Sequence, residues 1–390
     1  MFHVATEEDV LQGRVTDVYF TRAVEILRGR GVDKRVRAEI VVKNLPAKYD
    51  WGILAGTDEL LPFLERLNLE IDVRALPEGT RFRANQPVIE LAGRYLDFCI
   101  YETAILGLIC QASGVTTRAA RCAAAAEGRP VFCFGARRVH PVIAPLVERY
   151  AYLAGCAGVA GVRSAEMLGI EPSGTMPHAL ILLLGDTVEA TKAFADQFPQ
   201  VKTISLIDTF NDEKFEAIRI AETLKERVAA LRLDTPASRK GNLKAILREV
   251  RWELKLRSHG HIQLFVSGGL SEESIREFNE VADGYGVGTF VTSAPVLDFS
   301  LDIVEIDGKP VAKRGKTSGS KALFRCGGCQ REEVVPLGQT PPPCSCGGEW
   351  QSLLGQVISK GKMTAAARER LENLAARRDY IRAQVSAASS

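Results

Sequence analysis

Residues 262–289 read IQLFVSGGLSEESIREFNEVADGYGVGT, an apolar run, a glycine loop, an amphipathic stretch and a second apolar run with glycines. The pattern predicts a strand over 262–266, a helix over 271–280 and a strand over 284–287. Such a βαβ unit has parallel strands, and similar units recur from about residue 130 onward. We therefore expect an α/β fold whose parallel strands curl into an irregular, TIM-like barrel, although a doubly wound open sheet would give a similar pattern.

Two loops of this stretch are typical of phosphate binding. Ser267, Gly268 and Gly269 follow the first strand, and Gly286, Gly288 and Thr289 repeat the arrangement at the second. Glycines there leave backbone N–H groups exposed to an anion beside the start of a helix. Either loop alone equally suits a tight βα turn, but two in succession near the end of a barrel favour a phosphorylated ligand.

Charged side chains follow other predicted strands. Arg137 and Arg138 come shortly after a strand that ends at Phe134, and they suit a carboxylate or a phosphate as well as a salt-bridged surface loop. Asp208 and Asp234 end strand-like runs. Carboxylates in that position suit ribose hydroxyls or Mg²⁺ and equally suit helix N-capping.

A single histidine begins an apolar helix. His178 follows Thr175 in the string Gly-Thr-Met-Pro-His. Histidine in such a place is a candidate phosphate partner, acid–base group or nucleophile, and a structural histidine is the competing interpretation.

Four of the nine cysteines are clustered with the spacing C-x2-C-x14-C-x-C. They are Cys326, Cys329, Cys344 and Cys346. Two close thiolate pairs flanked by glycines predict a structural, tetrahedral Zn²⁺ site. The other five cysteines are scattered, so the usage favours a reducing cytoplasm over disulfides.

Composition excludes several classes of protein. Hydrophobic residues make up 46% of the 390 residues, and 50 Lys and Arg against 48 Asp and Glu leave a net charge of +2. We therefore expect no electrostatic binding to nucleic acid and no membrane association, and no apolar run is expected to span a bilayer. The polar, acidic first residues do not resemble a signal peptide.

The organisation along the chain predicts four parts. Residues 1–110 form an N-terminal α/β sandwich-like domain completed by 297–320, and 111–296 form the barrel. Residues 321–358 form a small zinc module built on the four clustered cysteines, and 359–390 form a C-terminal amphipathic helix.

In their order and spacing, these motifs resemble nicotinate phosphoribosyltransferase, within the type II phosphoribosyltransferases. The resemblance rests on TDVY at 16–19, FGARR at 134–138, GTMPH at 174–178, LIDT at 206–209, RLDT at 232–235, and the two glycine loops. The cysteine quartet resembles a short archaeal and bacterial branch of the family that carries a zinc knuckle.

The resemblance implies the reaction of nicotinate with phosphoribosyl pyrophosphate, which yields nicotinate mononucleotide and pyrophosphate, in a homodimer with shared sites. It implies that Tyr19 of a second copy and Phe134 sandwich the pyridine ring. Arg137, Arg138 and Arg232 would meet the carboxylate or the pyrophosphate. Asp208 and Asp234 would hold the ribose, directly or through Mg²⁺, and the glycine loops would hold the 5′-phosphate.

His178 matches a histidine that many members phosphorylate with ATP, which would formally make the enzyme a ligase. The string lacks the family's acidic residue after the histidine, so ATP coupling stays open. Two alternatives remain: quinolinate phosphoribosyltransferase, which shares the fold and would need more cationic groups, and a non-catalytic zinc-ribbon protein that binds nucleic acid.

Overall fold

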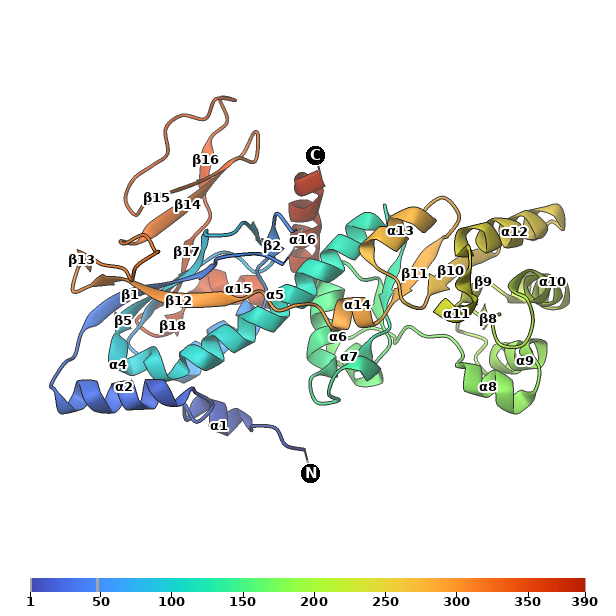
Figure 1. Cartoon of the computed structure of the whole chain (residues 1–390), viewed down its shortest axis with the longest axis horizontal. Helices are drawn as coiled ribbons and strands as arrows, with labels where there is room; N and C mark the ends of the chain where they lie inside the picture. Colours follow the sequence, from blue (N-terminus) through green and yellow to red (C-terminus); the bar gives the residue numbers. More distant parts are fainter. Residues whose placement is uncertain (1, 47–48, 390) are drawn as a thin grey trace. The chain divides into compact units, whose positions relative to one another are not determined.

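The structure is a computed structural model and describes residues 2–46 and 49–389 (Figure 1). The chain forms two compact units: Met1–Thr117 together with Pro295–Ser390, and Arg118–Ala294. The first unit is therefore built from both ends of the sequence and the second from its middle.

The middle unit contains a six-stranded sheet in the order β7-β6-β11-β10-β9-β8, and every neighbouring pair is parallel. Its strands are β6 (Val131–Cys133), β7 (Gly158–Val159), β8 (Ile204–Leu206), β9 (Ala230–Leu233), β10 (Gln263–Ser267) and β11 (Gly284–Val287). The expected α/β class with a curled parallel sheet is confirmed. The sheet stays open, because β7 and β8 are its two edges.

Helices follow the strands of this unit. They are α6 (Ala144–Leu153), α7 (Val162–Leu168), α8 (His178–Leu184), α9 (Thr187–Gln197), α10 (Glu213–Leu224), α11 (Ala237–Lys240), α12 (Leu243–Leu256), α13 (Glu272–Phe278) and α14 (Thr289–Thr292). The longest, α12, buries Leu243, Leu247, Val250 and Leu254, the spacing that lets one helical face pack on a sheet.

The other unit is organised by an antiparallel, seven-stranded sheet in the order β13-β12-β1-β5-β3-β17-β18. Its strands are β1 (Arg35–Val42), β3 (Asp72–Ala75), β5 (Pro87–Arg94), β12 (Phe299–Ile306), β13 (Lys309–Pro310), β17 (Gly355–Ser359) and β18 (Lys362–Met363). The small pair β2 (Gly52–Ile53) and β4 (Arg81–Phe82) and the helices α1 (Glu7–Leu11), α2 (Val18–Gly29) and α3 (Thr57–Arg66) complete its N-terminal part.

One helical run differs from what the sequence suggested. Residues Tyr95–Ala125, which comprise α4 (Tyr95–Phe98), a 3₁₀ turn and α5 (Glu102–Ala125), are long and apolar enough to cross a bilayer. The expectation that no run has this property was wrong. Ile105 and Ile109 of α5 are fully buried in the core that β1 and β5 also line, so packing within a domain accounts for part of this apolar run.

The C-terminal residues also differ from the single expected helix. Strands β14 (Lys321–Cys326), β15 (Glu332–Pro336) and β16 (Trp350–Ser352) form a separate antiparallel sheet. Residues 359–390 begin with the end of β17 and with β18, followed by two helices, α15 (Ala365–Glu372) and α16 (Leu374–Ser389). The chain leaves α15 at Asn373, whose side chain caps the next helix by accepting the N–H of Ala376 at 2.9 Å.

Candidate active site

The carboxyl ends of the parallel strands carry most of the predicted residues. Phe134 follows β6, Asp234 follows β9, Gly268 follows β10 and Gly288 follows β11. Parallel neighbours end at the same edge of a sheet, and this edge is where α/β folds bind ligands. The site is thus assembled by strand order, since β6, β11, β10 and β9 are consecutive in the sheet.

Two cavities lie at this edge. The smaller, of about 170 Å³, is lined by the aromatic rings of Phe132, Phe134 and Phe265 together with Thr175 and Arg232. The larger, of about 520 Å³, has a lining that is partly polar and partly apolar. Its lining includes the predicted residues Arg137, Arg138, Asp234, Ser267, Gly268, Gly269, Gly288 and Thr289. Phe134, Arg232, Ser267 and Gly286 line both cavities.

Arg232 is fixed by its surroundings. Its Nε donates to Ser267 Oγ at 2.8 Å, its Nη1 donates to Thr175 Oγ1 at 3.0 Å, and its Nη2 lies 3.3 Å from Asp234 Oδ2. Its guanidinium carbon also lies 5.3 Å from the centre of the Phe134 ring, within cation–π range. A preorganised guanidinium beside aromatic rings suits a flat, anionic ligand.

Two glycines are required by close approach. A Cβ at Gly286 would lie 2.5 Å from Cε2 of Phe134, and a Cβ at Gly268 would lie 2.9 Å from Oδ1 of Asp234. Gly268 also has a φ of +85°, and Gly269 a φ of +66°, conformations that glycine adopts without strain. The Phe134 ring can approach Gly286, and the Asp234 side chain can approach Gly268, only because glycine has no Cβ.

His178 and Asp208 form a separate pair. His178 Nε2 lies 3.3 Å from Asp208 Oδ1, and the Asp208 side chain is only 2% exposed. Burial raises the pKa of Asp208 above its ordinary value, while attraction to His178 opposes the rise. The other carboxylate oxygen, Oδ2, is buried without a hydrogen-bond partner among the described residues. As described, the two cavity linings do not include this pair.

The remaining predicted side chains are exposed. Arg137 and Arg138 lie on a 3₁₀ turn, Ala136–Arg138, at the larger cavity. Tyr19 belongs to the other unit, on α2, with 58% of its surface exposed and its hydroxyl 3.3 Å from Asp17 Oδ2. The structure thus places all three side chains on the surface of their own units.

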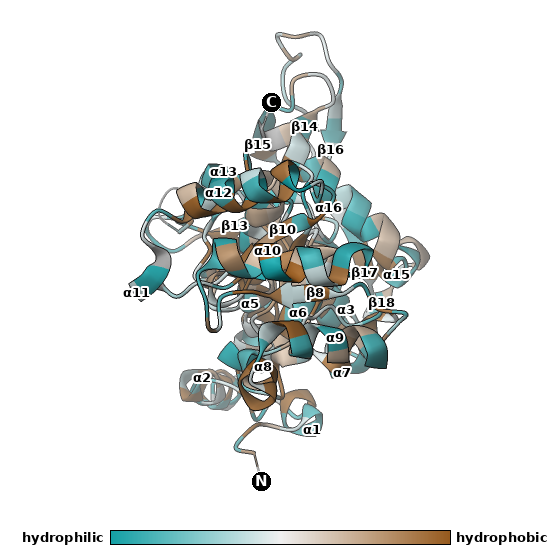
Figure 2. Cartoon of the chain, turned by 90° about the vertical axis from the view of Figure 1, so that its right-hand side faces the viewer, coloured by the Kyte–Doolittle hydropathy of each residue, from teal (hydrophilic) through white to brown (hydrophobic). Residues whose placement is uncertain are grey.

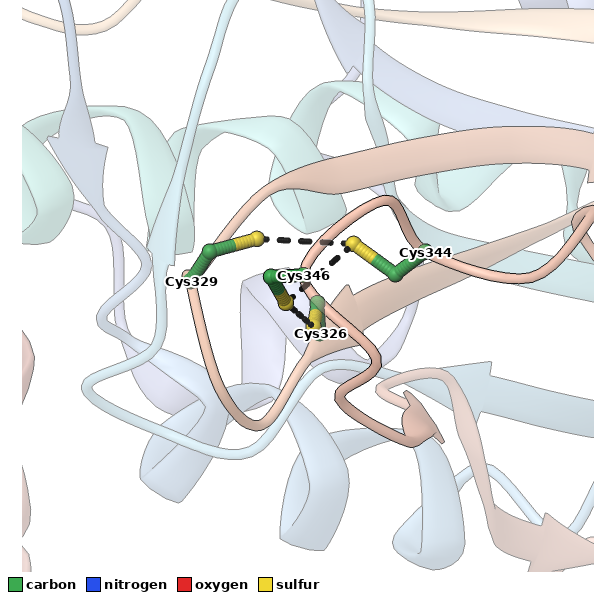
Figure 3. A group of neighbouring side chains, drawn as sticks. All are labelled: Cys326, Cys329, Cys344 and Cys346. Atoms are coloured by element: carbon green, nitrogen blue, oxygen red, sulfur yellow. Dashed lines mark hydrogen bonds between the residues drawn. The ribbon is translucent and has the colours of Figure 1, made fainter.

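The four clustered cysteines converge (Figure 3). Their Sγ atoms lie within 4.8 Å of one another, with Cys326 to Cys346 at 3.4 Å and Cys329 to Cys344 at 3.5 Å. Sulfurs about 2.3 Å from a tetrahedral Zn²⁺ would be about 3.8 Å apart, whereas a disulfide is about 2.05 Å long. Backbone N–H groups of Cys329 and Gly328 help to lower the pKa of Cys326 to about 6. The group can therefore hold a metal ion.

Sequence reasoning missed several residues of the cavities. Phe132, Phe265 and Lys202 line the smaller cavity, and Arg118 lines the larger. The two phenylalanines are on strands, where an aromatic side chain signals only a core. Arg118 had a visible signal, because it is a charge in an otherwise alanine-rich helical stretch.

An aromatic cavity that shares residues with a cationic, glycine-lined cavity, in an α/β fold, is suited to a phosphorylated ligand beside a flat anionic one. Comparison with known proteins identifies the family. Residues 17–113 match the model of the quinolinate phosphoribosyl transferase N-terminal domain, and residues 115–302 match that of its C-terminal domain. The chain belongs to this family, the type II phosphoribosyltransferases.

Individual relatives support the same family. The chain is 33% identical over 357 residues to nicotinate phosphoribosyltransferase pncB2 of Mycobacterium tuberculosis, covering 87% of this chain and 74% of the relative. A solved nicotinate-nucleotide pyrophosphorylase from Pyrococcus furiosus is 45% identical with a TM-score of 0.91, covering 97% of this chain and 98% of that one. Human nicotinic acid phosphoribosyltransferase has a TM-score of 0.77 at 19% identity, covering 95% and 93% of the two chains, and shows the shared fold.

Proposed function

We propose that this chain is a nicotinate phosphoribosyltransferase, which forms nicotinate mononucleotide and pyrophosphate from nicotinate and phosphoribosyl pyrophosphate. The proposal rests mainly on Arg232, which lines both the smaller, aromatic cavity and the larger cavity that the two glycine loops line. The curated relatives of the same name support it.

In this proposal the pyridine ring lies in the smaller cavity against Phe134, and its carboxylate binds Arg232. The ring nitrogen then faces the larger cavity, where Asp234 holds the ribose hydroxyls. Gly268, Gly269, Gly288 and Thr289 hold the 5′-phosphate, and Arg137 and Arg138 neutralise the pyrophosphate. Tyr19 from a second copy would cover the open face of the ring.

The chemistry requires positioning and charge neutralisation. Substitution at the anomeric carbon passes through an oxocarbenium-like state, and pyrophosphate leaves with a high negative charge. Fixed guanidinium groups stabilise that charge as it develops. The pyridine nitrogen has its own lone pair, so no general base is needed to activate it.

The acidic residues fit a divalent cation. Mg²⁺ in proteins typically binds one or two carboxylates together with substrate phosphates, and Asp208 has a buried oxygen without a partner while Asp234 lines the larger cavity. Bound at Asp234, which lines the larger cavity, Mg²⁺ would neutralise the pyrophosphate.

His178 is proposed as the site of ATP-dependent phosphorylation. Asp208 supports this role, because a carboxylate 3.3 Å from Nε2 holds the imidazole in one orientation. The ATP arm of the assay below tests it separately from the transferase step.

The cysteine group is proposed to hold a structural Zn²⁺, and the chain is proposed to be a cytoplasmic homodimer. Helix α8 supports a contact with a second copy, because Leu183 is 86% exposed and Leu182 58% exposed on a helix that is largely hydrophobic in Figure 2. Large exposed apolar side chains that lie together are typical of protein interfaces.

One assay tests the function. Purified protein is given phosphoribosyl pyrophosphate and Mg²⁺ with nicotinate, nicotinamide or quinolinate, each with and without ATP. Nicotinate mononucleotide from nicotinate is the expected product. Product only from quinolinate, with release of CO₂, would assign the chain to the related enzyme instead. No product from any acceptor would refute the proposal, and salt-sensitive retention on nucleic acid would then support the zinc-ribbon alternative.

A further inference from the structure

We propose that Arg118 binds the 5′-phosphate of the ribosyl substrate, a role that rests on the proposed function. Arg118 lies in the part of α5 that belongs to the middle unit, and it lines the larger cavity together with Gly288, Thr289 and Phe290. It is therefore a cation on the phosphate-loop side of the site.

The guanidinium of Arg118 is held at that place. Its central carbon lies 4.4 Å from the centre of the Phe290 ring, and its Nη1 donates to the Phe290 carbonyl at 3.2 Å. Phe290 directly follows Thr289 in α14. Arg118 is thus fixed to the residue next to the second glycine loop, and stacking on an aromatic face keeps a guanidinium planar and oriented.

The phosphate loops need a cation of this kind. The helices after them are short: α13 has seven residues and α14 has four. The N-terminus of a helix supplies only about half a positive elementary charge, whereas a phosphate monoester carries about 1.5 to 2 negative charges at pH 7. A dianionic phosphate in these loops therefore also needs a cationic side chain, and Arg118 lies beside α14 in the lining of the same cavity.

Helix α5 is also fixed against the first glycine loop. One turn after Arg118, Arg121 donates from Nε and Nη2 to the two carboxylate oxygens of Glu272, at 2.7 and 3.2 Å. Glu272 is the first residue of α13, directly after the loop that holds Gly268 and Gly269. The two-bond pair holds α5 and the loop in one geometry, as binding a phosphate between them requires.

The test separates the two ends of the substrate. Binding of ribose 5-phosphate and of inorganic pyrophosphate is measured by calorimetry for the wild type, Arg118→Ala, Arg118→Lys and Arg163→Ala. Arg163 is a matched control, because it is 72% exposed and its Nη1 lies 3.2 Å from Glu166 on the same short helix. Removing a charge-assisted contact should raise the Kd for ribose 5-phosphate in Arg118→Ala by about 10- to 100-fold.

The expected pattern has further parts. Arg118→Lys should show an intermediate loss, since it keeps the charge without the planar fork, and pyrophosphate binding should be unchanged. Ribose 5-phosphate affinity equal to that of the wild type in a folded Arg118→Ala protein would overturn the proposal, as would an equal loss for pyrophosphate. If wild type binds ribose 5-phosphate through Arg118 but forms no nucleotide, the proposed function fails and this assignment stands.

Discussion

Replacing Gly286 by alanine should disable the site without unfolding the protein. The new Cβ would lie 2.5 Å from Cε2 of Phe134 and 3.2 Å from Cβ of Ser267. Carbon atoms in contact are normally about 3.5–4.0 Å apart, so the Phe134 ring has to move by about 1 Å. The ring lines both cavities and lies under the Arg232 guanidinium, so its movement disturbs the stacking face and the cation together.

The size of the effect follows from this displacement. Overpacking of this kind costs about 1–3 kcal/mol of stability, which a domain of this size tolerates. A displacement of about 1 Å at reacting groups can lower the rate about 100-fold. We expect kcat/KM for nicotinate to fall by about that factor.

Steady-state kinetics with nicotinate as the varied substrate measure this change, and circular dichroism confirms folding. Gly355→Ala is the control, because a Cβ at Gly355 meets no atom within 4 Å. A folded Gly286→Ala enzyme with wild-type kcat/KM would show that the ring can move freely, and that Phe134 does not define the nicotinate subsite.

The remaining predictions concern three other places in the fold. Cys329→Ser should release the bound metal and lower the melting temperature, and metal analysis showing an unchanged content would contradict the zinc assignment. His178→Ala should abolish any stimulation by ATP while transferase activity remains; loss of binding of every substrate would indicate a structural histidine instead. Burial, with Asp58 nearby, raises the pKa of Glu78 from 4.5 to about 7. The folded state therefore keeps the proton on Glu78 to a higher pH than the unfolded chain does. Protonated Glu78 adds to the free energy of unfolding below pH 4.5, and this contribution is lost as the pH rises through 7. Denaturant unfolding at a series of pH values should show a smaller loss of unfolding free energy in Glu78→Gln than in the wild type, and identical pH profiles of the two proteins would refute the prediction.

Local patterns in the sequence were sufficient for the parts of the fold that depend on neighbours along the chain. The run 262–289 predicted β10, α13 and β11 closely, because apolar periodicity and glycine position are local properties. The cysteine spacing likewise predicted four converging sulfurs. Two features of the C-terminal residues were not predicted: strand β18, and the break at Asn373 between α15 and α16. An amphipathic pattern does not show where a helix begins or ends when pairing with a distant strand is the alternative.

The sequence by itself determined which residue types stand in the loops at the carboxyl ends of the strands, and these residue types carry the chemistry. Only the tertiary structure decided which of them meet. Arg232 and Ser267 are far apart in the chain and share a hydrogen bond because β9 and β10 are neighbours in a parallel sheet. Arg118 was visible in the sequence as a charge in an alanine-rich helical stretch, but only the packing of that helix brought it to the larger cavity. Contacts between distant residues depend on strand order and helix placement, and no local pattern encodes these.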